Sequence, residues 1–352
     1  ILPPEVIEQH GDYSDWRDVV GTGPFMLTQH VENVSMTRTR NPNYHDFDEK
    51  YPENRLPYVD ELKGLFMPEE ATRLAAFRTG QVDIIHVAGG GTQINTFEVI
   101  ESVLRTNPDI QVGPYFLRAL GQIGLNTRRP PFDDIRVRQA INYATNRTGI
   151  VKALFRDLGQ PAAQLIPSGV VGYNDQLQPW PHATDKAKAL IDEARADGVP
   201  VDREIRLIGR TAQFPKIAET IEVLQSEFTE IGLNVKIEMM DTASQLEYQL
   251  RPFPPNTGPY LLMIMHGNQA GDAAFTMDQY MLSDGPQSAY GTAKFDAKIR
   301  AAEQLEGQAR QDAFAELFAE EPQQIMQMAY LAHMRGILGK SPRVDYTPNS
   351  AT

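Results

Sequence analysis

The 352-residue chain contains no cysteine. This absence excludes zinc ribbons, iron–sulfur clusters, thiol nucleophiles and disulfide frameworks, because each of them requires cysteine sulfur. A chain of this length buries about three quarters of its unfolded surface, so a hydrophobic core can hold it together without a disulfide or a metal. At roughly 100 to 200 residues per domain, the length predicts two domains or one two-lobed body.

Basic residues are in deficit, with 33 Lys and Arg against 46 Asp and Glu, and the formal net charge is −13. Nucleic acids and anionic membranes are bound through clustered Lys and Arg, so the charge argues against both partners. Long hydrophobic runs are also absent, since residues 260–265 form the longest one and a membrane-spanning helix needs about 20. The chain begins Ile-Leu-Pro-Pro, without an initiator Met or the basic and apolar regions of a signal peptide. We therefore expect a targeting signal to have been removed or to lie upstream.

Residues 204–265 alternate between strand and helix patterns. The apolar residues between Pro215 and Gly232 recur every three or four positions, which is typical of one helix face, and a glycine is favoured just after a helix. The expected elements are a strand at 204–208, a helix from near Pro215 to Gly232, a strand at 233–239, a helix at 243–250 and a strand at 260–265. This order predicts an α/β layer with right-handed crossovers.

The remaining segments show the same style. We expect a helix that Thr184 caps and Gly198 ends, and a second helix that Asp133 or Asp134 caps. Further expected elements are strands at 59–67, 82–85, 110–115 and 121–126 and a helix at 69–78. Residues 251–259 and the tail after Gly339 are expected to be irregular.

Motifs for catalysis or cofactor binding are missing. The segment from Gly336 to Ser341 resembles the end of a phosphate-binding loop, but Met334 occupies the place of its first glycine, so a turn is expected. The seven histidines include no H-E-x-x-H pair, and no G-x-S-x-G segment is present. We therefore expect neither a catalytic residue nor a metal or cofactor, and we expect the protein not to be an enzyme.

Several segments, among them residues 186–190, 231–235 and 310–317, together resemble family five of the solute-binding proteins of ABC importers, which carry dipeptides, oligopeptides and nickel. Residues 20–25 are similar to the family's G-T-G-P-[YF] turn and residues 40–44 to its R-N-P-x-Y segment. Residues 70–84 are similar to its helix and strand ending in G-x-V-D, and residues 125–144 are the strongest match. In this family these motifs shape the scaffold and do not contact the ligand.

The resemblance implies an α/β fold of the two-lobed periplasmic-binding-protein type, in its type II, large cluster-C form. Residues 1–121 would form a partial first lobe, residues 122–334 the second lobe, and residues 335–352 would return to the first. Strands near 121–126 and 328–335 would cross between the lobes. Family members begin well upstream of the G-T-G-P turn, so we expect the N-terminal part of the first lobe to be missing from this chain. The ligand cage of this chain alone would then be incomplete.

A ligand site is expected after the strand at 260–265. In peptide-binding relatives, the segment after this strand carries an Asp that pairs with the α-ammonium of the peptide. Aligned through Asp272, that position holds Gln269, and a neutral amide cannot neutralise a buried ammonium. His266 and Asn268 would act as neutral hydrogen-bond partners. This favours an oligosaccharide or an opine-like ligand over a simple peptide. If the alignment slips by a residue, Asp272 itself anchors the amine.

Three further residues are secondary candidates for the site. Arg118 lies beside the expected hinge, and Arg210 and Phe214 lie in the loop after the strand at 204–208, which faces the ligand cleft in the family. By composition alone, Arg210 is an ordinary surface arginine, and Tyr115 and Tyr260 are ordinary core aromatics.

The implied function is to capture a solute between two lobes and deliver it to a membrane permease. The protein would be periplasmic, or extracellular and membrane-anchored, and it would be a monomer or paired with a chain that carries the missing part. An oligopeptide or dipeptide binder proper is the alternative, and a hydrolase on the same fold has no supporting motif. A chemoreceptor partner or a chaperone is a third reading, since some two-lobed binding proteins act in this way.

Overall fold

The computed structural model describes residues 3–11, 15–48, 51–67, 69–87, 111–125, 129–156, 159–211, 213–214, 216–268 and 270–345. The chain divides into two compact units, residues 1–75 and 76–352. None of the helices in the described ranges combines the length and the hydrophobicity that a membrane crossing requires.

The first unit contains a three-stranded antiparallel sheet in the order β1-β2-β3. Its elements are α1 (Pro4–His10), the 3-10 helix η1 (Trp16–Asp18), β1 (Phe25–Val31), β2 (Ser35–Arg40) and β3 (Glu61–Leu65), and α2 (Glu70–Arg78) runs on into the second unit. Among its described residues, Ser35, Thr37 and Pro57 are buried, and the buried hydrophobic residues begin only at Ala76. This unit therefore has little apolar core of its own.

The second unit contains a larger sheet, in which the described residues form seven strands. The strands are β4 (Ile84–Val87), β5 (Gln111–Leu125), β6 (Gly159–Pro161), β7 (Glu204–Arg210), β8 (Asn234–Met240), β9 (Tyr260–Gly267) and β10 (Met328–Lys340). Their order is β4-β10-β5-β9-β7-β8, with β6 paired to β10. The pairs β9–β7 and β7–β8 are parallel and the other pairs are antiparallel. The expected parallel α/β layer is thus part of a mixed sheet.

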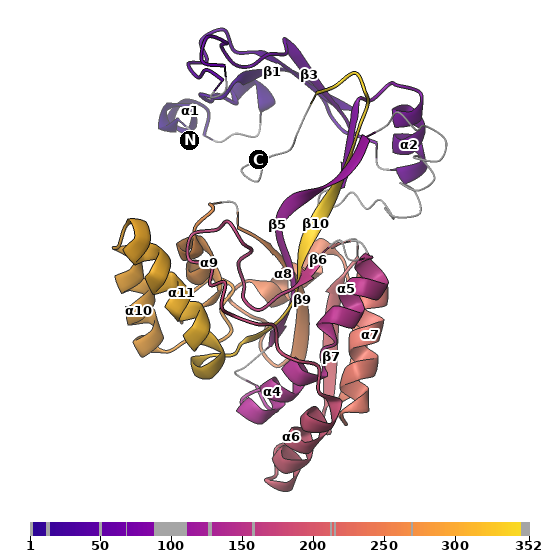
Figure 1. Cartoon of the computed structure of the whole chain (residues 1–352), viewed down its shortest axis with the longest axis vertical. Helices are drawn as coiled ribbons and strands as arrows, with labels where there is room; N and C mark the ends of the chain where they lie inside the picture. Colours follow the sequence, from indigo (N-terminus) through magenta and orange to yellow (C-terminus); the bar gives the residue numbers. More distant parts are fainter. Residues whose placement is uncertain are drawn as a thin grey trace. The chain divides into compact units, whose positions relative to one another are not determined.

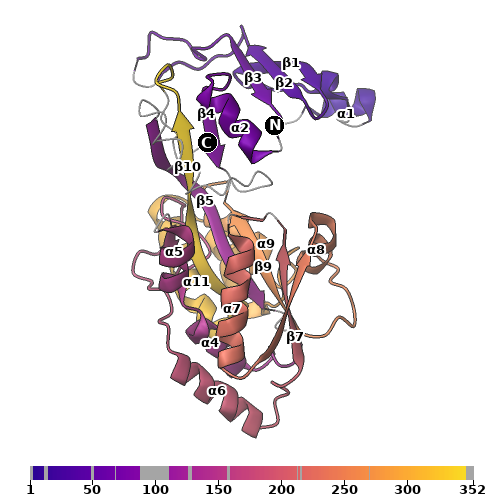
Figure 2. The same ribbon diagram turned by 90° about the vertical axis from the view of Figure 1, so that its right-hand side faces the viewer.

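Helices cover both faces of this sheet (Figures 1 and 2). They are α4 (Ile135–Ala144), α5 (Arg147–Phe155), α6 (Thr184–Ala196), α7 (Ile217–Glu230), α8 (Thr242–Gln249), α9 (Ala273–Tyr280), α10 (Ala293–Glu303) and α11 (Gly307–Gln324). Successive residues of a strand point to opposite faces. Accordingly, Leu261 and Met263 of β9 join the core with α4 to α7, whereas Leu262 and Ile264 join the core with α9 to α11.

Helix termini in the second unit follow local sequence chemistry. Asp134 is the N-cap of α4, and its side chain accepts a hydrogen bond from Arg136 N, so the second of the two expected caps is the one used. Gly232 follows α7 with φ of 92°, a backbone conformation that a glycine adopts at little cost. The expectation that Thr184 caps its helix was wrong. Thr184 is the first residue of α6, and its hydroxyl lies 3.2 Å from His182 Nε2.

Two further expectations were wrong, because pairing with a neighbouring strand decides the conformation of these segments more strongly than their own sequence pattern does. The segments 110–115 and 121–126 are not two strands, since β5 runs unbroken from Gln111 to Leu125 along β10. The expected turn at 336–341 is strand to Lys340, because β10 pairs with both β4 and β5 there. The helix expected near Pro215 begins at Ile217, and Pro215 lies outside the described residues.

The lobe boundaries at residues 121 and 334, and the crossing of two strands between lobes, stay predictions. Both boundaries fall within continuous strands of the second unit, β5 and β10. These two strands pair over most of their lengths, with register shifts between Tyr330 and Ala332 and between Met334 and Arg335.

Candidate functional site

The expected site residues His266, Asn268 and Asp272 lie together where β9 ends and α9 begins. β9 lies beside the parallel strand β7, so the carboxyl ends of both strands meet at one edge of the sheet. This is the edge at which α/β sheets bind ligands. The predicted residues therefore lie at the carboxyl end of β9, the edge of the sheet where a ligand site is expected.

His266 is a buried, neutral side chain. Its Nε2 lies 2.7 Å from Thr276 Oγ1, and its ring contacts the rings of Phe275 and Tyr280 at centroid distances of 5.9 and 4.8 Å. Burial lowers the pKa of His266 to about 4, so the imidazole carries no charge at neutral pH. These contacts hold the ring against α9, and its contact with a solute stays a prediction.

Asn268 shapes the loop between β9 and α9. Its Nδ2 donates to Thr276 Oγ1 at 2.8 Å and to the Asp272 carbonyl oxygen at 2.9 Å, and its Oδ1 accepts from Asp272 N at 3.2 Å. The side chain is almost fully buried, with 1% of its surface exposed. Asn268 thus ties the end of β9 to Asp272 and α9.

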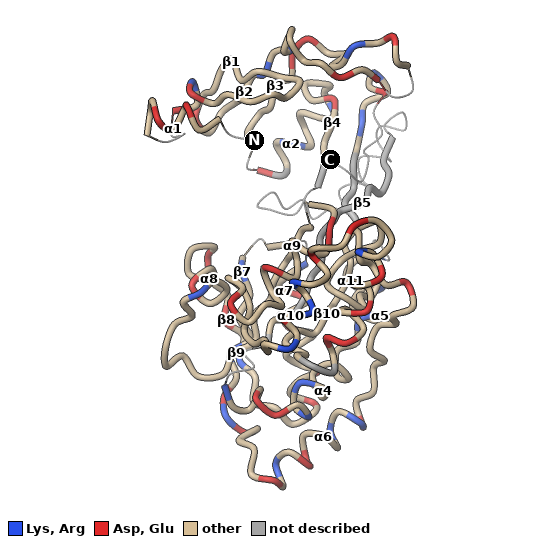
Figure 3. Tube along the Cα trace, turned by 90° about the vertical axis from the view of Figure 1, so that its left-hand side faces the viewer, with Lys and Arg blue, Asp and Glu red and all other residues tan. Residues whose placement is uncertain are grey.

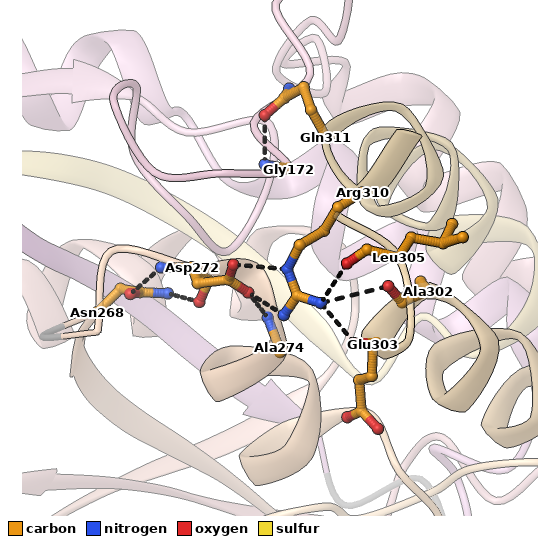
Figure 4. A network of polar contacts seen from close by, with 9 residues as sticks. All are labelled: Gly172, Asn268, Asp272, Ala274, Ala302, Glu303, Leu305, Arg310 and Gln311. Atoms are coloured by element: carbon orange, nitrogen blue, oxygen red, sulfur yellow. Dashed lines mark hydrogen bonds and ion pairs between the residues drawn. The ribbon is translucent and has the colours of Figure 1, made fainter. Parts of the chain in front are cut away.

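Asp272 is the N-cap of α9 and the partner of Arg310 on α11 (Figure 4). Its Oδ1 accepts from Ala274 N at 2.8 Å, and Arg310 donates from Nε to Oδ2 and from Nη2 to Oδ1, both at 2.8 Å. Burial by itself would raise the pKa of Asp272, but the hydrogen bonds from Arg310 and Ala274 N hold it below its ordinary value. Both carboxylate oxygens are therefore already engaged by positive or donor groups.

Arg310 links this loop to two other segments (Figure 4). Its Nη1 donates to the carbonyl oxygens of Glu303 at 2.8 Å and of Ala302 and Leu305 at 3.3 Å, which closes the turn between α10 and α11. The neighbouring Gln311 accepts from Gly172 N at 2.6 Å. Backbone hydrogen bonds from Val171 N to Gly271 O and from Ala273 N to Val171 O complete the connection. The loop after β9 is thus held from both sides.

Of the other predicted residues, Arg210 and Phe214 are not part of this network. Arg210 is half-buried at the end of β7, and Phe214 is in the core with its ring 6.2 Å from that of Phe155. Arg118 lies on β5, but its side chain is outside the described part of the chain, as is the whole of Gln269. Tyr260 is a buried core residue that donates from its hydroxyl to Tyr248 O, as expected for an ordinary core aromatic.

Two residues that organise the site were not expected from the sequence. Asp272 is recognisable in the sequence as a helix N-cap, and Thr276 lies one helical turn after it, so this spacing could have indicated Thr276. Arg310 follows Asp272 by 38 residues, and no sequence pattern connects them. The described residues contain no group of three or more His, Asp or Glu side chains able to hold a metal.

The comparisons with known proteins agree on one family. The model of the bacterial extracellular solute-binding proteins, family 5 (Middle), matches residues 3–287. The chain is similar to the heme-binding protein A of Haemophilus influenzae, with 28% identity over 215 residues, 61% of this chain and 36% of that protein. It is equally similar to the dipeptide-binding protein of Escherichia coli, with 28% identity over 221 residues, 62% of this chain and 38% of that protein. The matched part therefore spans little more than a third of these relatives.

Solved structures show the same fold. The periplasmic binding protein DppA from Helicobacter pylori, in complex with the peptide STSA, matches with a TM-score of 0.76 and 21% identity, over 98% of this chain and 64% of that one. AgaA from A. tumefaciens R10, in complex with agropinic acid, matches with a TM-score of 0.71 and 22% identity, over 97% of this chain and 65% of that one. These likenesses confirm the expected periplasmic-binding-protein fold class. The chain belongs to family 5 of the bacterial extracellular solute-binding proteins.

Proposed function

We propose that the protein is the solute-binding component of an ABC import system, which captures a ligand and delivers it to a membrane permease. The observation that carries this proposal is the family match, which extends over residues 3–287. Such a protein works outside the cytoplasmic membrane, in the periplasm or anchored to the cell surface. The family that matches is one of solute-binding proteins, so binding without turnover is the proposed activity.

We propose further that the loop after β9 recognises a neutral or hydroxylated part of the solute. Arg310 and the first turn of α9 already engage the Asp272 carboxylate, so an ammonium group would have to displace an arginine to pair with it. Gln269 lies in the same loop and is uncharged. In this proposal Gln269, Arg210 and Arg118 contact the solute, whereas His266 and Asn268 hold the loop in shape.

The relatives support both ligand classes. A solved relative holds agropinic acid and another holds a peptide. The engaged state of Asp272 favours the first class, an opine-like or saccharide ligand, over an ordinary peptide. An oligopeptide or dipeptide binder remains the second candidate, supported by the peptide-binding relatives.

The test is a calorimetric titration of wild type and Gln269→Asp with agropinic acid, maltose, trialanine and N-acetyl-trialanine. Wild type should bind without distinguishing the free from the acetylated peptide. Gln269→Asp should gain affinity for the free amine by about tenfold to a hundredfold, because a hydrogen bond to a charged group contributes about 1.5 to 3 kcal/mol.

Two controls make the titration decisive. Glu303→Gln changes an acidic side chain at the α10–α11 turn and should leave the peptide preference unchanged. Recovery of the bound compound in unaltered form separates a binder from an enzyme. Tight wild-type binding of trialanine that disappears on acetylation would return the site to the peptide class.

A further inference from the structure

Two buried glutamine side chains converge on a single carbonyl oxygen of β9. Gln213 follows β7 and Gln245 lies on α8, and their amide nitrogens donate to Met263 O at 3.0 and 2.7 Å. Their residue surfaces are 1% and 0% exposed. Because both nitrogens lie within 3.0 Å of the same oxygen, the two amide groups are close neighbours inside the second unit.

The oxygen ends of these amides accept no hydrogen bond from any described residue. Two other glutamines, Gln164 and Gln327, are equally buried, but both of their ends are used. Gln164 donates to Asn174 O and accepts from Asn174 N. Gln327 donates to Tyr280 O and accepts from the backbone N–H groups of Ala289 and Tyr290. Buried amides in this protein are thus normally satisfied, and the pair on Met263 O departs from that rule.

Reversing the amides does not remove the deficiency. A glutamine turned by 180° would place its oxygen against Met263 O, and two acceptors would then face each other. A buried acceptor without a donor is costly, and native proteins rarely leave such atoms unsatisfied. The two oxygens therefore indicate a donor group that the described residues do not supply.

The position of these oxygens in the sheet suits a bound group. β7 pairs with β9 only as far as Ile208 and Leu262, although β7 continues beside β8 to Arg210. The two parallel strands thus stop pairing one residue before Met263, and the amides reach its carbonyl there. The chain goes from β7 to β8 on one side and then returns to β9 on the other. Such a reversal of strand order is where α/β sheets bind ligands.

We propose that Gln213 Oε1 and Gln245 Oε1 form a buried site for a small hydrogen-bond donor. The group is a water molecule or the hydroxyl, amide or ammonium end of a solute, since both oxygens can only accept. An anion or a carbonyl group does not fit, because it brings no proton. The donor connects the loop after β7 to α8, the two segments whose glutamines reach Met263 O.

The experiment compares the unfolding of wild type with that of Gln213→Met and Gln245→Met. Each variant removes one oxygen, while Met263 O keeps the amide of the other glutamine. If a donor is bound, each change leaves it without one acceptor, and the equilibrium constant for folding should fall about tenfold. If the oxygens are truly unsatisfied, each variant loses only its amide hydrogen bond to Met263 O, and a loss no larger than that of a variant lacking one such bond would overturn the proposal.

Gln225→Met is the matched control, because Gln225 also donates its amide to a strand carbonyl, Val235 O at 2.9 Å. Its loss measures the value of one such hydrogen bond, and the two site variants must lose more than this control. A high-resolution crystal structure provides an independent readout if a variant does not fold. A non-protein atom within hydrogen-bond distance of both oxygens supports the proposal, and a backbone N–H or nothing in that place refutes it.

Removing any retained solute from the protein shows whether the donor is water or part of a solute. Protein that has been unfolded, dialysed and refolded in solute-free buffer contains only water and buffer ions. If the variants lose the same stability before and after this treatment, the donor is water. If the loss is seen only for protein as purified, the donor is part of a retained solute, which native mass spectrometry will then identify. Neither result depends on transport, so this test of the site is independent of the proposed importer function.

Discussion

Glu321, on α11, is a fully buried carboxyl group whose ionisation opposes folding. Burial raises the pKa of Glu321 to about 7, although Tyr330 donates a hydrogen bond to its Oε2 at 3.0 Å and Arg138 lies nearby. In the unfolded chain the carboxyl has its ordinary pKa, so the folded state holds the proton more tightly. The stability that this group contributes is complete below its unfolded pKa and is lost as the pH rises through about 7.

We expect Glu321→Gln to remove this pH dependence. Relative to the variant, wild type should lose up to about 1.4 kcal/mol of unfolding free energy per pH unit between pH values of about 5 and 7. Urea unfolding at a series of pH values measures the difference. Glu320→Gln, which changes a partly exposed carboxylate paired with Lys298, should follow wild type. Parallel curves for wild type and Glu321→Gln would contradict the assignment.

The Asp272–Arg310 pair is the second residue-scale contact with a measurable consequence. Asp272→Asn should lower the unfolding free energy by about 1.5 to 3 kcal/mol, since it weakens charge-assisted hydrogen bonds to a mostly buried arginine. Arg310→Met should cost a similar amount, and the double variant should cost less than the sum. Asp312→Asn, on the exposed side of α11, should cost little. Strict additivity of the two site variants would show that the pair does not act as a unit.

At the scale of elements, the loop that contains Gly172 is packed tightly against α9 and α11. A Cβ at Gly172 would lie 2.5 Å from Phe314 Cβ and 2.7 Å from Ala273 Cβ. Gly169 in the same loop has nearly the same backbone angle, with φ of 87° against 92°, but a Cβ there meets nothing within 4 Å. The pair of glycines therefore separates backbone strain from packing.

We expect Gly169→Ala to cost about 1 to 3 kcal/mol through backbone strain alone. Gly172→Ala should cost about 1 to 3 kcal/mol more, because the added methyl group forces α9 and α11 away from the loop. Thermal and urea unfolding of the two variants give the comparison. Equal losses would mean that the loop moves away freely and does not connect the two helices.

At the scale of the whole molecule, the two units differ in how much apolar surface they bury. The described hydrophobic residues that are buried all lie in the second unit. Charged residues of both signs are interspersed along the chain (Figure 3), whose formal net charge is −13. Because its described residues bury so little apolar surface, the first unit depends on its β-sheet hydrogen bonds more than on a core.

Hydrogen exchange should report this difference. We expect the amides of β1, β2 and β3 to exchange faster than those of β7, β8 and β9, because segments with few buried apolar contacts open at lower free energy. Mass spectrometry of peptic fragments measures both sets in one experiment. Protection of β1 to β3 as strong as that of β7 to β9 would show that further contacts stabilise the first unit.

The sequence by itself was sufficient for most of the local structure of the second unit. The spacing of Val137, Ala140, Ile141 and Ala144 predicted the buried face of α4, and all four side chains are buried. Gly198 and Gly232 marked helix ends for a similar reason, since each has the positive φ that favours glycine. Signals of this kind lie within a few residues of the feature that they specify, so a reader of the sequence has all of the relevant information.

Only the tertiary structure decided which distant side chains meet. β5 is one strand because β10 pairs along it, and no property of residues 116–120 alone predicts that. Arg310 reaches Asp272 across 38 positions, and Gln213 and Gln245 reach Met263 from a loop and a helix that come together only after the sheet has formed. Periodicity specifies which face of an element is buried. The partner that covers this face follows from strand order and helix packing, and these are decided by the free energy of the whole unit.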